Sequence, residues 1–278
     1  MNKVAFITGA SRGIGKAVAH KLAGEGWDII VAAKSTEEHP KLPGTIFTAA
    51  EELSQHGTDI LPVRCDVTDL ESIHTATQAA LDHFGRMDAV INNAGALWWE
   101  NMDNTPMKRY DLINNVNVRG SFAVTQAFLP IMKEQKSGHV ITMSPPYDEA
   151  MLAGHIAYNI SKFGMTMIAV GIPQEFSQYN IHGSALWPHT MIESFATINF
   201  ALGERSSWRK ADILADATWE ILQHPELSDG KALLDEHFLR LVGYTEFDDY
   251  ACEPDGTPFV ISSEGQRAQQ APVEGVKS

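Results

Sequence analysis

The sequence predicts one doubly wound α/β domain, in which a parallel β-sheet carries helices on both faces. Two observations support this prediction. Short segments that are apolar at most positions alternate with longer segments of helical periodicity, and a glycine-rich turn joins the first apolar segment to the first helical one. Parallel strands covered on both faces are apolar at nearly every position, and such alternation is typical of βαβ units. The predicted strands are Val4–Thr8, Asp28–Ala33, Ile60–Cys65, Ala89–Asn92, His139–Met143 and Ile181–Leu186.

Two stretches interrupt the alternation. Ser35–Thr45 contains two prolines and a glycine and is predicted to be a long loop, and His237–Ile261 carries aromatic side chains without clear periodicity. We expect one domain over residues 1–261 with a packed C-terminal extension from about residue 236. Residues 262–278 are small and polar, which predicts a flexible tail. The predicted helices include Lys16–Gly24, Ser72–His83, Ser121–Lys133 and Ile156–Phe176.

The composition is that of a globular protein with a strongly acidic surface. The chain has 278 residues, of which 44% are hydrophobic, and a formal net charge of -14. Such a surface repels phosphate backbones and anionic headgroups, which excludes nucleic acid and membrane surfaces as main partners. Cys65 and Cys252 are far apart and are expected to be reduced. With no signal peptide or membrane-spanning run, the sequence predicts a cytoplasmic protein without a metal site.

A glycine-rich turn lies where the first strand meets the first helix. Its glycines would allow a tight turn and a close approach of the backbone to a pyrophosphate. The N–H groups and positive dipole end of the following helix would also attract phosphate. The alternative is a turn without a ligand, and the strand before it and helix after it favour phosphate binding. The turn reads Thr8-Gly9-Ala10-Ser11-Arg12-Gly13-Ile14-Gly15.

Tyr158 and Lys162 are four residues apart in a predicted helix, so their side chains share one face. A phenol has an ordinary pKa near ~10, and a neighbouring ammonium stabilises the phenolate and lowers that pKa. This shift would bring the phenol toward the range of general acid–base catalysis. The alternative is an amphipathic helix on which the tyrosine and the lysine merely lie near the surface.

Three segments together resemble the short-chain dehydrogenase/reductase family. They are the turn Thr8–Gly15, the Asn-Asn-Ala-Gly segment Asn92–Gly95 after the fourth strand, and Tyr158–Lys162, which matches the family motif Tyr-x-x-x-Lys. They occur in the family's order and spacing, and the resemblance covers about residues 3–235. It implies a Rossmann-type fold and hydride transfer between a substrate and a nicotinamide cofactor.

The resemblance implies roles for single residues. Tyr158 would transfer the proton, Lys162 would hold the nicotinamide ribose, and Asn117 would brace a proton-relay water. The family serine that polarises the substrate oxygen lies 13 residues before the tyrosine, where this chain has Pro145, which has no donor. Either the neighbouring Ser144 takes that role or the donor is lost, and we expect Ser144 to take it.

The residues after the second strand favour NADP over NAD. An acidic residue there would bind the ribose 2′-hydroxyl and repel a 2′-phosphate, but the chain has Lys34, and Arg12 could also reach a 2′-phosphate. His189 stands where the family has a glycine, and it either contacts the substrate or is structural. The cofactor-binding residues implied by the resemblance are Gly9, Ser11, Arg12, Gly13, Ile14, Gly15, Lys34, Asp66, Val67, Asn93, Ala94, Gly95, Tyr158, Lys162, Pro188 and Thr190.

Other stretches resemble a narrower group of this family, the hydroxysteroid dehydrogenase-like proteins. The group shares the proline pair after the serine, and some members continue into a sterol-carrier domain, for which this chain ends too early. Met191–Trp208 lies where family members have a mobile substrate lid. Its apolar side chains, together with Trp98, Trp99 and Trp187, either bind an apolar substrate or pack in the core or between subunits. The resembling stretches include Ala32–Lys34, His39–Ile46, Ser144–Pro146 and Ala185–Pro188.

The sequence therefore predicts an NADP-dependent enzyme that interconverts a carbonyl and an alcohol on a hydrophobic small molecule. The alternative is a cofactor-binding protein of the same fold with weak or no catalysis, acting in regulation or interaction. A third option is different chemistry on this fold, such as epimerisation or dehydration. By analogy with the family, the helices over Ser121–Lys133 and Ile156–Phe176 are expected to form a homodimer or homotetramer.

Overall fold

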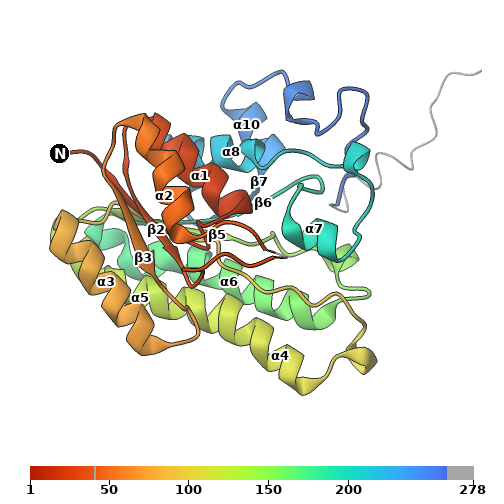
Figure 1. Ribbon diagram of the computed structural model, residues 1–278, viewed down its shortest axis with the longest axis horizontal. Helices are drawn as coiled ribbons and strands as arrows, with labels where there is room; N and C mark the ends of the chain where they lie inside the picture. The colour runs from red at the N-terminus through yellow and green to blue at the C-terminus, as the bar shows by residue number, and fades with distance from the viewer. Residues whose placement is uncertain (41, 262–278) are drawn as a thin grey trace, which may run out of the picture.

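Seven parallel strands form one sheet through the centre of the molecule (Figure 1). The computed structural model describes residues 1–40 and 42–261. The strand order is β3-β2-β1-β4-β5-β6-β7, which confirms the predicted doubly wound fold of Rossmann type. The strands are β1 (Val4–Thr8), β2 (Asp28–Ala33), β3 (Ile60–Arg64), β4 (Ala89–Asn92), β5 (Gly138–Met143), β6 (Ile181–Trp187) and β7 (Lys231–Leu234).

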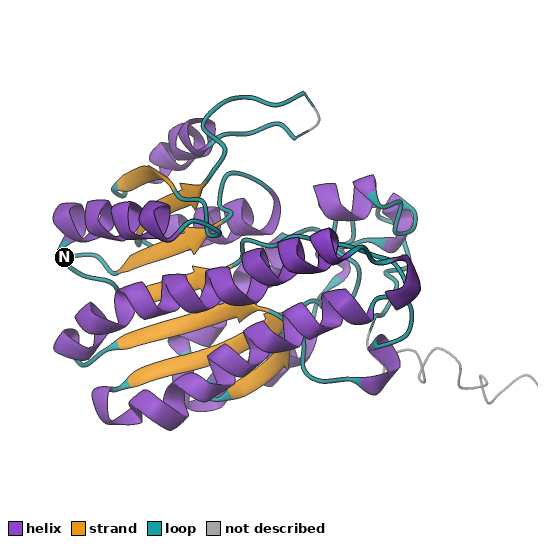
Figure 2. Ribbon diagram, turned by 90° about the horizontal axis from the view of Figure 1, so that it is seen from below, coloured by secondary structure: helices purple, strands orange, loops and turns teal. Residues whose placement is uncertain are grey.

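Helices cover both faces of the sheet, as the two views in Figures 1 and 2 show. Helices α1, α2, α8 and α10 lie on one face, and α3, α5 and α6 lie on the other. The helices are α1 (Gly13–Gly24), α2 (Ile46–Leu53), α3 (Leu70–Phe84), α4 (Met107–Asn114), α5 (Gly120–Gln135), α6 (Ile156–Phe176), α7 (Phe195–Asn199), α8 (Asp212–Gln223), α9 (Pro225–Ser228) and α10 (Asp235–Leu241).

Alternate residues of each strand enter two separate cores. On β1, Ala5 and Ile7 pack in the core beneath α1 and α8, whereas Phe6 packs in the core beneath α3 and α5. The ring of Phe6 lies 4.7 Å from the ring of Phe128 on α5. Successive side chains of a strand point to opposite faces, so a strand covered on both sides needs apolar residues at nearly every position. This explains why the strands are continuous apolar runs in the sequence.

The order of the strands places a crevice at one edge of the sheet. The chain proceeds from β1 to β2 and β3 on one side, and from β4 to β7 on the other. In a parallel doubly wound sheet, ligands bind at the carboxyl ends of the strands where this order reverses. Thr8 ends β1, Asn92 ends β4, Met143 ends β5 and Trp187 ends β6, so all four lie along that edge.

Strand β7 was not predicted. Its four residues, Lys231–Leu234, are exposed or half-buried, because it is the last strand of the sheet and pairs only with β6. β4 is equally short but fully buried, so the exposure of β7 is what weakens its apolar signal. Among the helices named from the sequence, α6 has the predicted bounds Ile156–Phe176.

The C-terminal extension returns to the carboxyl edge of the sheet. After α10, residues 242–261 are mostly irregular, and Val260 forms an antiparallel bridge with Thr190 in the loop after β6. The N–H of Met191 donates to the carbonyl oxygen of Phe259 at 3.0 Å. The loop predicted over Ser35–Thr45 contains no helix or strand in its described part. The tail predicted over 262–278 lies outside the described residues.

Both cysteines, Cys65 and Cys252, are buried and free. Within residues 1–40 and 42–261, no helix has the combined length and apolar character that crossing a membrane requires.

Candidate active site

The turn between β1 and α1 has the backbone that close phosphate binding requires. Gly9 and Gly13 have φ angles of +68° and +56°, in the left-handed region that favours glycine. A Cβ on Gly15 would lie 2.6 Å from the carbonyl oxygen of Gly9, so a side chain there would displace the turn. Arg12 is the N-cap of α1 and its side chain makes no cap hydrogen bond. The first N–H groups of the helix are therefore not satisfied by a side-chain cap and face the space before it.

The segment after β4 holds this turn in place. The Thr8 Oγ1 accepts hydrogen bonds from the backbone N–H groups of Asn93 and Ala94, both at 3.0 Å. The Asn93 Nδ2 donates to the carbonyl oxygen of Thr8 at 2.9 Å. A Cβ on Gly95, two residues on, would lie 3.6 Å from the Lys162 Nζ. The predicted cofactor residues after β1 and β4 therefore lie together, next to the predicted catalytic lysine.

Tyr158 and Lys162 lie on one face of α6, as their spacing predicts. Both side chains are buried, with Tyr158 9% and Lys162 5% exposed. The Lys162 Nζ donates to the carbonyl oxygen of Met143 at the end of β5 at 2.8 Å, and lies 5.9 Å from the centre of the Tyr158 ring. The amine is thus fixed between the sheet edge and the phenol.

The expected effect of the lysine on the phenol is not seen. Burial raises the pKa of Tyr158 above its ordinary value, the opposite direction from the predicted lowering. Burial also lowers the pKa of Lys162 to about 7, so the amine is only partly charged at neutral pH. Desolvation therefore outweighs the attraction between ammonium and phenolate. A phenol that stays protonated is suited to donate a proton.

Asn117 lies in a π-helical turn, Asn115–Arg119, between α4 and α5. Its side chain is fully buried, and its Oδ1 accepts the backbone N–H of Ala96 at 2.8 Å. Its Nδ2 donates to the Ala96 carbonyl oxygen at 3.0 Å and to the Ser161 Oγ at 2.9 Å. Single π-helical turns often occur at functional sites. The side-chain amide of Asn117 ties the loop after β4 to α6 beside Lys162.

Ser144, the predicted donor to the substrate oxygen, is held within the fold by several contacts. Ser144 is fully buried, and its hydroxyl shares a hydrogen bond with the Thr142 Oγ1 at 2.9 Å. Its N–H donates to the carbonyl oxygen of Leu186 on β6 at 2.9 Å. The next carbonyl, that of Pro145, accepts a hydrogen bond from the Thr166 Oγ1 at 2.6 Å. Backbone and side-chain contacts thus hold this segment in place, and Ser144 does not line the cavity above Tyr158.

A cavity of about 620 Å³ lies above Tyr158 and Lys162. Within the described chain, Lys162 is the only Lys, Arg, Asp or Glu side chain among its lining residues. Trp99 and Trp187 line it, whereas Trp98 does not. No group of three His, Cys, Asp or Glu side chains in the described ranges could hold a metal ion. The apolar wall of the cavity includes Trp99, Met151, Met191, Phe195, Phe200 and Phe259.

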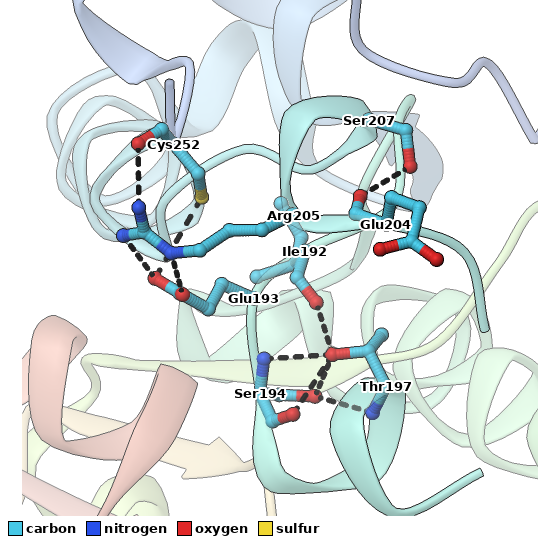
Figure 3. Close-up of polar contacts among 8 residues, drawn as sticks. All are labelled: Ile192, Glu193, Ser194, Thr197, Glu204, Arg205, Ser207 and Cys252. Atoms are coloured by element: carbon cyan, nitrogen blue, oxygen red, sulfur yellow. Dashed lines mark hydrogen bonds and ion pairs between the residues drawn. The ribbon is translucent and has the colours of Figure 1, made fainter. Parts of the chain in front are cut away.

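Residues 191–208 and 251–261 form a cap over this cavity. Arg205 joins the two segments, because its Nε donates to the Glu193 Oε1 at 2.6 Å and its Nη1 donates to the Cys252 carbonyl oxygen at 3.0 Å (Figure 3). Helix α7 begins with a capping box in which Ser194 and Thr197 bond each other's backbone. The segment predicted as a substrate lid therefore covers the cavity, with support from the C-terminal extension.

Arg12 is held against the loop that follows β2. Its Nη2 donates to the Ser35 Oγ at 2.8 Å and to the Gly44 carbonyl oxygen at 2.7 Å. Its Nε is buried without a hydrogen-bond partner. Lys34 is exposed at the end of β2. Glu38, on the same loop, lies close enough to Arg12 to favour the charged guanidinium, although burial lowers the pKa of Arg12 overall.

Asp66 and Val67 follow β3 at the same edge. Burial acts to raise the pKa of Asp66, but hydrogen bonds from Thr68 and the charge of Lys34 bring it below its ordinary value. Val67 is buried, and a Cβ on Gly120 would lie 3.0 Å from the Val67 side chain. Asp66 is therefore ionised after β3, while Val67 packs against the start of α5.

The loop after β6 carries the remaining predicted residues. Pro188 lines the cavity, and the Thr190 Oγ1 is buried without a hydrogen-bond partner. His189 does not line the cavity, since its ring packs 4.6 Å from the ring of His237. Its backbone N–H donates to the Asp235 Oδ1 at 2.8 Å. These contacts favour the structural interpretation of His189.

Asp235 carries no signal in the sequence. Its burial predicts that the stability of the folded protein falls as pH rises. Asp235 is fully buried at the start of α10, and burial raises its pKa from 3.8 to about 7. Between these two values the folded chain binds more protons than the unfolded chain, so stability falls as pH rises through this window. Since one pKa unit equals about 1.4 kcal/mol, the loss is at most about 4 kcal/mol.

We expect Asp235→Asn to remove this loss. The asparagine oxygen can still accept the N–H groups of His189 and Glu236, while the amide cannot ionise. Melting temperatures measured from pH 4.5 to 8 should show the variant gaining on the wild type as pH rises. A constant difference across that range would contradict the prediction, and an offset at low pH would report only the altered hydrogen bonding.

Comparisons with known proteins agree with this geometry. The profile of the short chain dehydrogenase family matches residues 3–199. Hydroxysteroid dehydrogenase-like protein 2 of Mus musculus is 44% identical over 252 residues, which cover 90% of this chain and 51% of the mouse protein. The chain thus spans about half the length of that relative.

Solved structures show the same fold. A short chain dehydrogenase from Mycobacterium thermoresistibile is 37% identical, with a TM-score of 0.86 and 93% of each chain covered. A metagenomic short-chain oxidoreductase in complex with NADP is 25% identical, with a TM-score of 0.70, and the match covers 84% of this chain and 95% of that one. The fold and the family match define a protein of the short-chain dehydrogenase class. The chain belongs to the short chain dehydrogenase family, and within it resembles the hydroxysteroid dehydrogenase-like proteins.

Several site residues escaped the sequence analysis. Phe259 and Ile261 line the cavity although they lie in the C-terminal extension, and His155 lines it three residues before Tyr158. The spacing between His155 and Tyr158 was the one signal available in the sequence. The two residues of the extension carried no signal, because only the fold brings the chain back to the sheet edge.

Proposed function

We propose that this protein is an NADP-dependent enzyme that interconverts a carbonyl and an alcohol on an uncharged, hydrophobic small molecule. One observation carries the proposal: Tyr158 and Lys162 line an apolar cavity that extends to Ile14, a residue of the glycine-rich turn. A proton donor, a lysine amine and the turn that we propose binds phosphate therefore border one cavity.

The residues at the carboxyl edge fit a nicotinamide dinucleotide. Gly9 and Gly15 form a turn that leaves no room for a Cβ, and the N-terminus of α1 has no side-chain cap. The Thr190 Oγ1 and the Arg12 Nε are buried polar atoms without partners, and buried polar groups normally have one. We propose that these groups bind the cofactor together with Lys162, which would hold the ribose.

Residues of this chain would transfer the proton that accompanies the hydride. When bound, the nicotinamide would supply or accept the hydride. Tyr158 is kept protonated by burial, so it can donate a proton to the carbonyl oxygen during reduction and take it back during oxidation. Lys162 stabilises the phenolate that remains, and Asn117 holds the loop and helix around both. The apolar cap excludes water, which strengthens these electrostatic contacts.

The basic residues beside the turn support NADP over NAD. Lys34→Glu should weaken NADPH binding by ~10-fold or more and strengthen NADH binding, because a carboxylate at the end of β2 would repel a 2′-phosphate and accept a ribose hydroxyl. Fluorescence titration with each cofactor measures the ratio of affinities. Lys108→Glu, the same charge change at an exposed site on α4, is the matched control. An unchanged ratio in Lys34→Glu would argue against the preference.

The apolar lining supports an uncharged substrate. A substrate carboxylate would be buried without a partner cation other than Lys162, which is already bonded to the Met143 carbonyl. Burying an unpaired charge costs several kcal/mol. The test is NADPH oxidation, followed by absorbance, with matched ketones that differ only in a terminal methyl or carboxylate. Turnover of the carboxylate partner alone would reject the proposed substrate class.

A second candidate function is cofactor binding with weak or no catalysis. Pro145 and the buried Ser144 support it, because neither residue of this segment presents a hydroxyl to the cavity that Tyr158 lines. NADPH binding without turnover of any ketone or aldehyde would favour this candidate. Epimerisation or dehydration would instead convert substrate with no net oxidation of NADPH.

We also propose that the chain forms a homodimer or homotetramer through α5 and α6. Exposed apolar side chains on these helices support it, with Phe122 56%, Ile160 45% and Met167 76% exposed. We propose that residues 1–261 form one domain, because the C-terminal extension packs on the loop after β6.

A further inference from the structure

Reduction of a carbonyl places negative charge on its oxygen, and one donor, Tyr158, rarely stabilises that charge alone. The serine position is Pro145, and Ser144 is bonded to Thr142 away from the cavity. A second donor must therefore come from another side chain that lines the cavity.

Several polar side chains that line the cavity are already bonded to the protein. The Asn93 Nδ2 donates to the Thr8 carbonyl oxygen at 2.9 Å, and the Asn159 Nδ2 donates to the Met151 carbonyl oxygen. Thr197 bonds to Ser194 and to the Ile192 carbonyl oxygen. Neither the Asn93 amide, which also donates to the Gly9 carbonyl oxygen, nor the Thr197 hydroxyl can turn to a substrate without breaking a contact within the fold.

His155 also lines the cavity, beside Tyr158. It lies three residues before Tyr158 at the start of α6, so the two side chains share a face of the helix, and both line the cavity. Its ring stacks on Trp99, with ring centres 3.8 Å apart and an angle of 16° between the planes. The same Trp99 ring lies 5.8 Å from the ring of Tyr158. Trp99 therefore holds the imidazole on the cavity wall next to the phenol.

The chemistry of this imidazole suits a donor. Stacking engages the face of the ring and leaves the nitrogen atoms, which lie in the ring plane, available at its edge. Burial lowers the pKa of His155, so the ring is neutral at pH 7 and carries one N–H donor. A neutral donor can stabilise a developing oxyanion without giving up its proton.

We propose that His155 is a catalytic residue that donates a hydrogen bond to the substrate oxygen beside Tyr158, in the place that Pro145 leaves without a donor. The inference rests on the proposed function of the site. His155 keeps its proton throughout, while Tyr158 transfers its own. Trp99 acts as a positioning residue that fixes the plane of the imidazole.

The test compares His155→Phe, which keeps an aromatic ring for the stack on Trp99, with His155→Gln, which supplies an amide donor. NADPH oxidation with acetophenone and cyclohexanone as probes should show kcat lowered by ~10²-fold in His155→Phe, with the Kd for NADPH unchanged. His155→Gln should recover at least about tenfold of that loss, because an amide N–H can replace the imidazole N–H. Equal losses in the two variants would mean a packing role and would overturn the inference.

Two further measurements separate this inference from the proposed function. Ser144→Ala should leave kcat within about twofold of wild type; a ~10²-fold loss there, with no loss in His155→Phe, would assign the role to the serine instead. If the wild type turns over neither probe, the proposed function fails in its own right. His155 can then be followed by nitrogen-15 NMR of the labelled histidine rings during titration with acetophenone and NADPH. An unshifted His155 signal under saturating probe would reject the contact.

Discussion

Tyr158→Phe is expected to lower kcat for carbonyl reduction by ~10²- to 10⁴-fold, which is the range lost with a positioned proton donor. The phenol is 9% exposed and lines the cavity, so no bulk water can readily replace its hydroxyl. The ring keeps its contact with Trp99 in the variant, and the affinity for NADPH should stay within about twofold, since the lost group contacts the substrate. Stopped-flow hydride transfer and NADPH fluorescence titration measure the two effects.

Tyr110→Phe is the matched control for this prediction. Tyr110 on α4 packs against the same small cluster of aromatic side chains, yet it does not line the cavity. Removing its hydroxyl should leave kcat unchanged. Turnover retained in Tyr158→Phe would reject the proton-transfer role, whereas equal losses in both variants would indicate a general disturbance of packing.

The second large effect is expected from Gly15→Ala. The added Cβ would lie 2.5 Å from the Asn93 Nδ2 and 2.6 Å from the Gly9 carbonyl oxygen, so the phosphate-binding turn and the segment after β4 must both move. Overpacking of this kind costs about 1–3 kcal/mol of folding free energy. Because the displaced atoms belong to the turn itself, we also expect NADPH to bind ~10- to 100-fold more weakly. Denaturant titration and cofactor titration measure the two losses.

Gly171→Ala is the matched control, for which we expect neither a loss of stability nor weaker NADPH binding. Gly171 lies inside α6, and a Cβ there would meet no atom within 4 Å. An alanine in a helix interior is favoured over glycine by about 0.5–1 kcal/mol, so this variant should be slightly more stable and bind NADPH as the wild type does. A Gly15→Ala variant that binds NADPH normally would show that the turn tolerates a side chain, contrary to the geometry.

The sequence was most informative where function depends on neighbours along the chain. Continuous apolar runs identified six of the seven strands, because a strand buried on both faces needs apolar residues throughout. The edge strand β7 escaped, since it is half-exposed. The glycines of the turn and the four-residue spacing of Tyr158 and Lys162 are local patterns, and backbone geometry alone places them correctly.

The direction of the pKa shifts could not be predicted in this way. Spacing places Lys162 near Tyr158, and the proximity of an ammonium alone would lower the pKa of the phenol. The fold buries both groups, and desolvation then raises the pKa of Tyr158 and lowers that of Lys162. Burial is a property of everything packed around a residue, so it has no signature in a short segment.

What the sequence determined by itself is therefore the fold class, the glycine-rich turn after β1 and the placement of Tyr158 and Lys162 on one face of α6. Only the tertiary structure decided that Ser144 is fully buried, with its N–H bonded to the carbonyl oxygen of Leu186 on β6. It also decided that Phe259 returns to the cavity and that Trp99 stacks on His155. The physical reason is range: local patterns follow from backbone geometry over a few residues, whereas these contacts join segments far apart in the chain and exist only once the sheet and its cap have packed.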